Sequence, residues 1–334
     1  MKKTVVIGDI SVKPGEIGFG KLEGPSLRNS QPVSLPLIVV NGASVGPTLW
    51  VEAAIHGLEL PGIEVIRRLT REEVDPARLC GTIIAVPTAN PYAFQAGVQF
   101  APQDNVDAHA IFPGDPNKSL SYRLAHLIYT EGILKCDYFI DLHSNYWPAI
   151  MFLPVPVCTN KDVMQRTLGM AEAFGLPICE VKNSPGWPAA RAQVEGKPAM
   201  VVELLYHGWV DRHSADVGVK GMLNVLKYLG MVEGKVEALP PSKVPPGWYG
   251  REFIYCSKGG IVTPKKDAGD RISAGEVVAV IRDIYGDIVE EVISPADGYV
   301  RTVLFGNLNQ AVCAGDIMYS YMAIRPKETF FAIG

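Results

Sequence analysis

The chain has 334 residues, of which 48% are apolar and 20% are charged. A length of this order predicts about two domains with a substantial buried core, and the composition excludes an intrinsically disordered protein. Lys and Arg number 31 against 35 Asp and Glu, which gives a formal net charge of −4. This slightly acidic balance argues against a protein that binds nucleic acid through a basic surface.

Neither hydropathy nor cysteine content points to a membrane or to an oxidising compartment. No apolar run approaches the roughly 18 residues that a membrane-spanning helix needs. The six cysteines lie far apart and form no CxxC pair. This favours reduced thiols and predicts a cytoplasmic protein without a membrane partner. The sequence leaves a homo-oligomer open.

Short apolar segments alternate with helical patterns through the first two-thirds of the chain. The apolar segments are mostly rich in β-branched or aromatic residues, as is typical of buried strands, and lie at 37–40, 49–55, 83–86, 138–142, 150–153 and 200–205. Helical spacing occurs at residues 63–67, 120–134, 163–174 and 219–229. This alternation predicts an α/β fold with a parallel or mixed sheet flanked by helices.

The pattern changes at a proline-rich stretch. Four prolines lie between residues 240 and 246, which predicts a stiff linker between a catalytic domain, 1–240, and a β-rich domain, 247–334. The second part has short β-branched runs at 260–262, 276–281, 288–293 and 298–304. Its sequence resembles a lipoyl-like barrel-sandwich domain. The lysine that carries the prosthetic group is missing from the expected hairpin, which argues against a carrier role.

Two histidines stand at the ends of predicted strands. His56 follows one strand and precedes Glu59 by three residues, while His143 ends another strand within the sequence DLHS. Strand ends at one edge of an α/β sheet are where such folds build active sites. Two imidazoles and a carboxylate suit a catalytic zinc ion with one open position. The alternative is that both are loop histidines held by local hydrogen bonds.

Glu203 is a charged residue near the end of an otherwise apolar strand. A carboxylate in such a place costs free energy unless it is paired or functional, so Glu203 is a candidate general base. A salt bridge at the strand end is the alternative. Some side chains near these positions either border a pocket or have ordinary core and loop roles, namely Tyr146, Trp147, His207 and His213.

Together these motifs resemble the succinylglutamate desuccinylase/aspartoacylase family, within the zinc carboxypeptidase superfamily. In chain order they are HGLE at 56–59, TANPYAF at 88–94, FPG at 112–114, DLHS at 141–144 and PAMVVEL at 198–204. The resemblance implies a zinc carboxypeptidase-like fold and one zinc ion per chain on His56, Glu59 and His143. It also implies that Glu203 is the general base and acid. Family members hydrolyse the amide of an N-acyl amino acid.

Two positions depart from the family pattern. Relatives have an Asp-Leu-Asn-Arg motif whose Asn and Arg bind a substrate carboxylate, where this chain reads DAHA from Asp107 to Ala110. The retained Asp107 is expected to accept a hydrogen bond from His56. His109 would contact a polar group of the substrate and, if its surroundings leave its titration near neutrality, make activity pH-sensitive. The arginine that polarises the scissile carbonyl is replaced by Gln99, which can donate a hydrogen bond but has no charge.

A substrate carboxylate would then need another partner. Arg191 lies 12 residues before Glu203, where relatives carry a substrate-binding arginine, although a surface arginine fits equally well. An arginine fork grips a carboxylate bidentately, and DAHA cannot copy that geometry. We therefore expect weak activity on N-acetylaspartate and N-succinylglutamate. Leaving groups that are neutral, cationic, or bulkier and less polar near Ala110 should be preferred.

The sequence thus predicts a zinc-dependent deacylase that cleaves the linear amide of a small N-acyl amine or N-acyl amino-acid-like substrate. Two alternatives stay open, a zinc carboxypeptidase-like peptidase and a metal-binding homologue without turnover. The missing Asn-Arg pair argues against the peptidase. The complete ligand set and Glu203 argue against the non-catalytic homologue. The sequence names neither the acyl group nor the amine.

Overall fold

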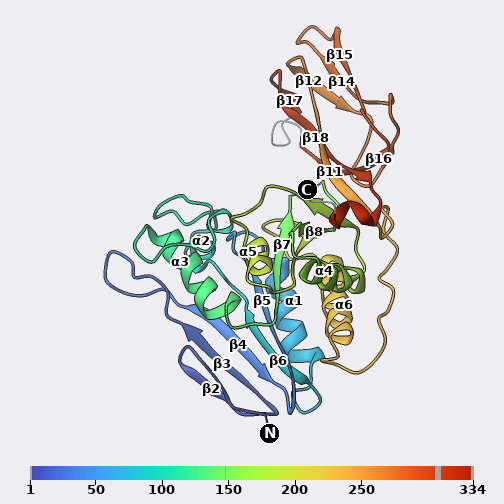
Figure 1. Cartoon of the computed structure of the whole chain (residues 1–334). Helices are drawn as coiled ribbons and strands as arrows, with labels where there is room; N and C mark the ends of the chain where they lie inside the picture. The colour runs from blue at the N-terminus through green and yellow to red at the C-terminus, as the bar shows by residue number, and fades with distance from the viewer. Residues whose placement is uncertain (1, 147, 305–309, 332–334) are drawn as a thin grey trace.

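The computed structural model describes residues 2–146, 148–304 and 310–331 (Figure 1). A hairpin of β1 (Val5–Ile7) and β2 (Ile10–Val12) precedes a six-stranded sheet. The strands of this sheet are β3 (Glu16–Leu22), β4 (Leu35–Asn41), β5 (Ser44–Ala53), β6 (Cys80–Val86), β7 (Tyr138–Asn145) and β10 (Ala199–Leu205). Their order is β10-β7-β5-β6-β4-β3. The first four run parallel, and β4 and β3 are antiparallel to their neighbours, so the sheet is mixed.

Helices cover both faces of this sheet (Figure 1). One face carries α1 (Pro61–Arg68), α4 (Lys161–Phe174) and α6 (Arg212–Tyr228). The other carries α2 (Pro91–Ala96), α3 (Leu120–Ile128) and α5 (Pro188–Val194). Side chains along a strand alternate between the two cores, so Val51 packs with the first set and Trp50 with the second. Both faces are buried, as the continuous apolar strands predicted.

The helices differ from their predicted bounds at their ends. The segment expected at 120–134 is α3 continued by a π-helical turn, η3 (Tyr129–Ile133). The helix expected at 219–229 begins earlier, at Arg212, because Asp211 caps it. Oδ2 of Asp211 accepts a hydrogen bond from the backbone N–H of Ser214 at 2.8 Å.

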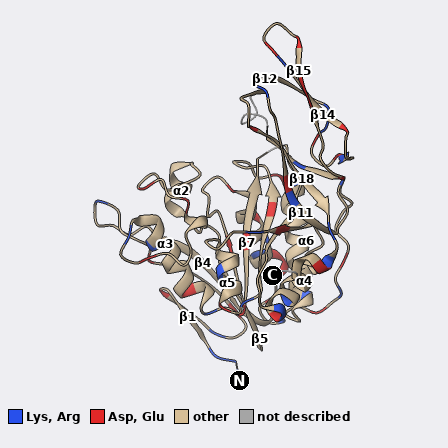
Figure 2. Cartoon of the chain, turned by 45° about the horizontal axis from the view of Figure 1, so that its top comes forward, with Lys and Arg blue, Asp and Glu red and all other residues tan. Residues whose placement is uncertain are grey.

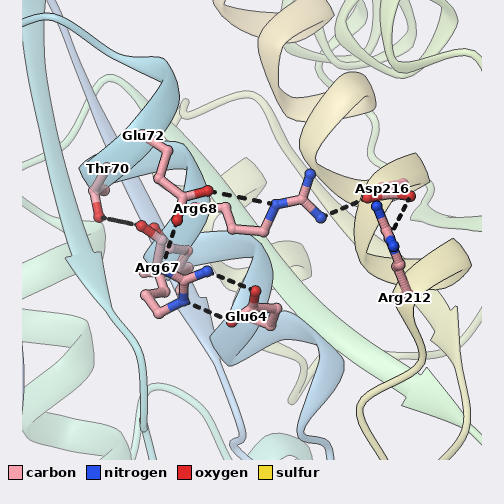
Figure 3. Close-up of polar contacts among 8 residues, drawn as sticks. Glu64, Arg67, Arg68, Thr70, Glu72, Arg212 and Asp216 are labelled. Atoms are coloured by element: carbon pink, nitrogen blue, oxygen red, sulfur yellow. Dashed lines mark hydrogen bonds and ion pairs between the residues drawn. The ribbon is translucent and has the colours of Figure 1, made fainter.

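Polar contacts join α1 and its π-helical extension η1 (Leu69–Glu73) to α6 (Figure 3). Nη1 of Arg68 lies 2.6 Å from Oδ1 of Asp216, and Arg67 bonds to Glu64 and Glu72 at 2.7 and 2.8 Å. These ion pairs are partly exposed, so each adds little to stability. Apolar contact beneath them is the main attachment of both helices to the sheet.

One predicted strand lies elsewhere. The strand expected at 150–153 is β8 (Leu153–Pro156), and it belongs to a second six-stranded sheet, of order β13-β16-β18-β11-β9-β8. β8 is an edge strand, where the missing N–H groups of Pro154 and Pro156 are tolerated. The other members are β9 (Ile178–Val181), β11 (Trp248–Tyr255), β13 (Arg271–Ile272), β16 (Gly298–Val303) and β18 (Ile317–Ile324).

Among its described residues, the C-terminal part is all β apart from a 3₁₀ segment, η5 (Lys327–Phe331). A four-stranded antiparallel sheet of order β15-β14-β12-β17 faces the C-terminal strands of the second sheet across a shared core. Its strands are β12 (Gly260–Pro264), β14 (Val277–Arg282), β15 (Ile288–Ile293) and β17 (Ala311–Val312). These sheets make a sandwich, and the described strands do not close into a barrel.

The proline-rich segment is packed rather than free. Val244 is buried, and the hydroxyl of Tyr249 donates a hydrogen bond to the carbonyl of Pro245 at 3.0 Å. Basic and acidic residues are interspersed along the chain (Figure 2). Within the described residues, every helix is too short or too polar to cross a membrane.

Candidate metal centre and active site

Three parallel strands bring the candidate residues to one edge of the central sheet. His56 lies three residues after the end of β5, His143 is near the end of β7, and Glu203 is near the end of β10. His143 and Glu203 are direct partners in the β7–β10 register. Since adjacent strands lie about 4.8 Å apart, the two residues are held side by side by the sheet itself.

His56, Glu59 and His143 form a buried cluster. Nδ1 of His56 lies 3.0 Å from Oε1 of Glu59, and Nδ1 of His143 lies 3.1 Å from the same oxygen. One ligand atom from each of the three residues falls within 4.8 Å of the others. Gly57 allows this tight turn, because a Cβ there would lie 2.3 Å from the backbone of Ala93 in α2.

Each histidine is held on its other nitrogen by a second carboxylate. Nε2 of His56 lies 3.1 Å from Oδ1 of Asp107, and Nε2 of His143 lies 2.7 Å from Oδ2 of Asp141. Sequence reasoning considered Asp107 and missed Asp141. The signal was present, since residues two apart on a strand point to the same face.

The charges in the cluster depend on one another. Burial alone would lower the pKa of His56, but Glu59 and Asp107 outweigh it and raise that pKa to about 9. Burial is likewise outweighed at His143, where Asp141 and Glu59 raise the pKa. The two imidazoles hold the pKa of the Glu59 carboxyl well below its usual range despite its burial.

This donor set fits a divalent metal ion. Both Nδ1 atoms face one carboxylate, and both Nε2 atoms are oriented by carboxylates, which is the arrangement that fixes histidine ligands around zinc. A second group, His109, Asp141 and His143, also has ligand atoms within 4.8 Å. In that group Nε2 of His143 is already bonded to Asp141, so the first group fits an ion better.

His109 is buried and lines the same cavity. It lies on a 3₁₀ turn, η2 (Ala108–Ala110), which Asp107 caps by accepting the N–H of His109 at 2.9 Å. Its ring centre is 4.5 Å from that of His143 and 4.7 Å from that of Trp187. Burial and the neighbouring His143 and His56 lower its pKa well below the usual value. The expected titration of His109 near neutrality held only for an unperturbed side chain, and this burial perturbs it.

Glu203 is part-buried and free of ion pairs within the described chain. Burial raises the pKa of its carboxyl, opposed by His143 and reinforced by Glu59. Its backbone forms a two-way bridge with Phe152, with N–O distances of 2.9 and 3.2 Å. Gln99 borders the same cavity, and its carbonyl accepts the N–H of Gly57 at 3.3 Å.

A cavity of about 290 Å³ joins these groups. Besides the residues above, its lining includes Tyr146, Pro154, Val181, Trp187, Val201 and His207. Arg251 and Arg301, on β11 and β16, also border it, so the C-terminal β part contributes to the site. Sequence reasoning did not single out either arginine.

Other sequence candidates lie apart or are only peripheral. Arg191, on α5, bonds to Glu195 and Tyr129 and is not among the residues bordering the cavity. His207 borders the cavity and stacks on Tyr146, whereas His213 borders a different one. Trp147 lies outside the described residues.

Comparison with known proteins agrees with these features. The model of the succinylglutamate desuccinylase/aspartoacylase catalytic domain matches residues 45–229, more than half of the chain. A curated relative is the N-alpha-acetyl-L-2,4-diaminobutyric acid deacetylase of Halomonas elongata. It is 26% identical over 259 residues, which cover 75% of each protein.

Solved structures share the fold over nearly the whole length. The succinylglutamate desuccinylase/aspartoacylase from Rhodobacter sphaeroides superposes with a TM-score of 0.83 at 25% identity, over 96% of this chain and 99% of that one. The ectoine utilization protein EutE (DoeB) from Ruegeria pomeroyi, with product bound, gives a TM-score of 0.80 at 22% identity, over 96% and 98%. The predicted α/β fold with a smaller β-rich C-terminal part is confirmed, and the chain belongs to the succinylglutamate desuccinylase/aspartoacylase family.

Proposed function

We propose that this chain is a zinc-dependent deacylase that hydrolyses the linear amide of a small N-acyl amine or N-acyl amino acid. The observation that carries the proposal is the convergence of His56, Glu59 and His143 beside Glu203 in one cavity. Family membership and the named deacetylase relative support an amide hydrolase. The substrate in the name of that relative carries a second amino group, which agrees with the cationic leaving group expected near Ala110.

One zinc ion per chain would be held by Nδ1 of both histidines and by the Glu59 carboxylate. When bound, it would polarise the scissile carbonyl and lower the pKa of a water molecule. Asp107 and Asp141 would keep His56 and His143 in the tautomer that presents Nδ1. Gln99 would donate a hydrogen bond to the carbonyl oxygen as negative charge develops there.

Glu203 would move the proton. A carboxyl whose pKa is raised by burial is better matched to proton transfer near neutral pH than an exposed one. It would accept the proton of the attacking water and deliver it to the leaving nitrogen. Its place beside His143 in the strand register puts it at the edge of the metal cluster, where both transfers would occur.

The cavity favours a small substrate over a peptide. Its volume of about 290 Å³ lies at the lower end of the range for small-molecule sites. Strands of the C-terminal part border it as well, which leaves little room for an extended chain. The six cysteines are free thiols, in keeping with the cytoplasmic setting that we propose.

Metal analysis and one conservative variant test the proposal. Purified protein should hold about one zinc ion per chain, His143→Ala should lose it, and His213→Ala, outside the cavity, should keep it. Glu203→Gln should keep zinc yet lower kcat by about 10²–10⁴ on an acyl-amine panel that includes N-acetyl-2,4-diaminobutyrate. Full zinc retention in His56→Ala and His143→Ala would place the site elsewhere. Zinc-loaded protein that is inactive on the whole panel would indicate the non-catalytic homologue.

A further inference from the structure

Arg301 is a buried cation without an acidic partner in the described chain. Only 6% of the residue is exposed. Its Nε donates a hydrogen bond to Oγ of Ser320 at 2.8 Å, and its guanidinium carbon lies 4.7 Å from the ring centre of Phe152. A buried charge with no counter-ion is costly, so a partner for the remaining guanidinium N–H groups is expected.

The backbone aims this side chain at the site. In the pairing of β16 with β18, Val300 faces Tyr321 and Thr302 faces Ser320, so Arg301 is the extra residue of a β-bulge. Bulges redirect side chains and are frequent beside active sites. The carbonyl of Arg301 accepts the N–H of Ile150 at 3.0 Å, which ties the bulge to the segment that carries Phe152.

Arg251 is a second cation on the same wall. It lies on β11, borders the cavity, and stacks on Phe253 at 4.9 Å. Two nearby acids are engaged elsewhere, since Glu252 pairs with Arg325 and Glu180 with Lys182. Glu203 interacts with Arg301 electrostatically but forms no ion pair with it. Burial, reinforced by Arg251, lowers the pKa of Arg301 to about 10, which still leaves it charged at neutral pH.

The side-by-side arrangement of residues across neighbouring strands indicates which end of a substrate lies near these arginines. His143 pairs with Glu203, Glu203 bridges to Phe152, and Phe152 lies under Arg301. Glu203 therefore stands between the metal cluster and the arginines. If Glu203 protonates the leaving nitrogen, the amine portion of the substrate extends toward Arg301.

We propose that Arg301 and Arg251, from the C-terminal strands, bind a carboxylate on the amine portion of the substrate. This inference rests on the proposed deacylase function. It supplies, from the C-terminal sheet, the carboxylate grip that the missing Asn-Arg pair would give. Arg301, stacked and held through Nε, presents its guanidinium nitrogens in a fixed orientation, which suits bidentate recognition.

Binding to chelator-treated protein tests this without catalysis. The matched probes are N-acetyl-L-alanine, its neutral amide N-acetyl-L-alaninamide, and N-propylsuccinamic acid, whose carboxylate lies on the acyl side. The chain should bind N-acetyl-L-alanine more tightly than the other two by calorimetry. Arg301→Met should lower the affinity for N-acetyl-L-alanine by about 10- to 100-fold and leave the affinity for the amide little changed. Arg251→Met should act in the same direction with a smaller effect, since Arg251 is exposed.

Controls separate charge, geometry and folding. Arg301→Lys keeps the charge but loses the fork, so it should recover only part of the affinity. Arg325→Met, outside the cavity and paired with Glu252, should bind all three probes like the parent chain. The proposal would be overturned if Arg301→Met lost affinity equally for N-acetyl-L-alanine and for its amide. It would also be overturned if Arg301→Met and Arg251→Met both bound N-acetyl-L-alanine as tightly as the parent chain. Preference for N-propylsuccinamic acid would overturn the assignment to the amine side.

The outcome is separable from that of the proposed function. Carboxylate discrimination that persists in a protein without zinc or turnover would leave this subsite standing and refute only the deacylase. Turnover without discrimination between the acid and its amide would refute only the subsite.

Discussion

At the scale of single residues, both ring nitrogens of each histidine in the proposed metal site have a carboxylate partner. Each has Nδ1 on Glu59 and Nε2 on an aspartate, Asp107 or Asp141. A carboxylate on Nε2 fixes the proton there and leaves Nδ1 as the ligand atom. The aspartates should therefore set metal affinity although neither is a ligand.

Asp141→Asn is expected to weaken zinc binding by about 10- to 100-fold, because the amide cannot accept the Nε2 proton of His143 as strongly. Competition with a zinc chelator measures this affinity directly. Asp137→Asn is the matched control, since Asp137 lies just before β7 and instead accepts the N–H of Thr48 at 2.8 Å. Unchanged affinity in Asp141→Asn would show that the 2.7 Å contact has no role in metal binding.

Glu52 is a buried acid that no catalytic step uses. Oε2 accepts the indole N–H of Trp50 at 2.7 Å, Oε1 has no partner within the described chain, and Asp141 is its neighbour in register. Burial, reinforced by Asp141, raises the pKa of Glu52 well above its usual value. Glu52 is therefore expected to keep its proton in the folded state at pH values where the unfolded chain has released it. The free energy of unfolding should then fall as pH rises from about 4.5 toward the higher pKa of the folded state.

Glu52→Gln should remove this pH dependence. Relative to the parent chain, its free energy of unfolding should increase between pH 5 and 8, by at most about 1.4 kcal/mol per pH unit. Denaturant unfolding of chelator-treated protein at three pH values measures the difference. Glu64→Gln is the control, because Arg67 lowers the pKa of Glu64, so its effect should be constant over this range. A constant difference for Glu52→Gln would mean that Glu52 is ionised in the fold.

Single residues also show which parts of the candidate site could be predicted from the sequence. His56, Glu59, His143 and Glu203 stood out because polar groups at the ends of apolar strands need a reason to be there. Arg301 is likewise a charge within an apolar run, yet a strand pattern cannot reveal that a bulge turns it toward Phe152 and the cavity. Register between distant strands comes only from the fold.

At the scale of elements, the strands and helices could be predicted from periodicity. The differences from prediction lie at the ends of helices and at the proline-containing strand β8. β4, β5, β6, β7 and β10 each contain a continuous apolar segment rich in β-branched or aromatic residues, so they were identifiable. β8 reads Leu-Pro-Val-Pro, and its pairing with β9 rather than the central sheet has no local signal. Strands belong to sheets through non-local contacts.

The turn between β5 and α1 depends on Gly57. A methyl group there would lie 2.3–2.5 Å from the backbone of Ala93 and Phe94, and a helix backbone cannot move aside cheaply. Gly57→Ala should destabilise the fold by about 1–3 kcal/mol and lower zinc occupancy, because His56 and Glu59 flank the displaced residue. Thermal unfolding and metal analysis measure both. Leu58→Ala, in the same turn without the clash, should keep its zinc. Full zinc occupancy in Gly57→Ala would show that α2 can move enough to accommodate the methyl group.

At the scale of the whole molecule, the two parts expected from the sequence share structure. β11 pairs with β9 in one sheet, so strands from either side of the proline-rich segment are bonded to each other. Phe330, near the end of the chain, is buried in the core formed with α1, α4 and α6. We therefore propose that residues 1–240 and 247–334 are one cooperative unit, with the sequence boundary marking a change of composition only.

Cutting the chain tests this cooperativity. A protease site inserted between Gly234 and Lys235, in an exposed stretch, would allow the peptide bond that joins the two parts to be cut without disturbing the shared sheet. The fragments should co-elute on size exclusion and melt in a single transition, because the β9–β11 pairing and the Phe330 contact remain. The N-terminal fragment expressed alone should bind a hydrophobic dye and be degraded quickly, since it exposes the β9 edge and the buried side chains of Phe152 and Cys179. Separation of the cut fragments into two stable, monodisperse species would instead establish independent domains.

In that case the C-terminal arginines would reach the cavity only through a weak interface between the fragments, and carboxylate binding should decline when the cut protein is diluted.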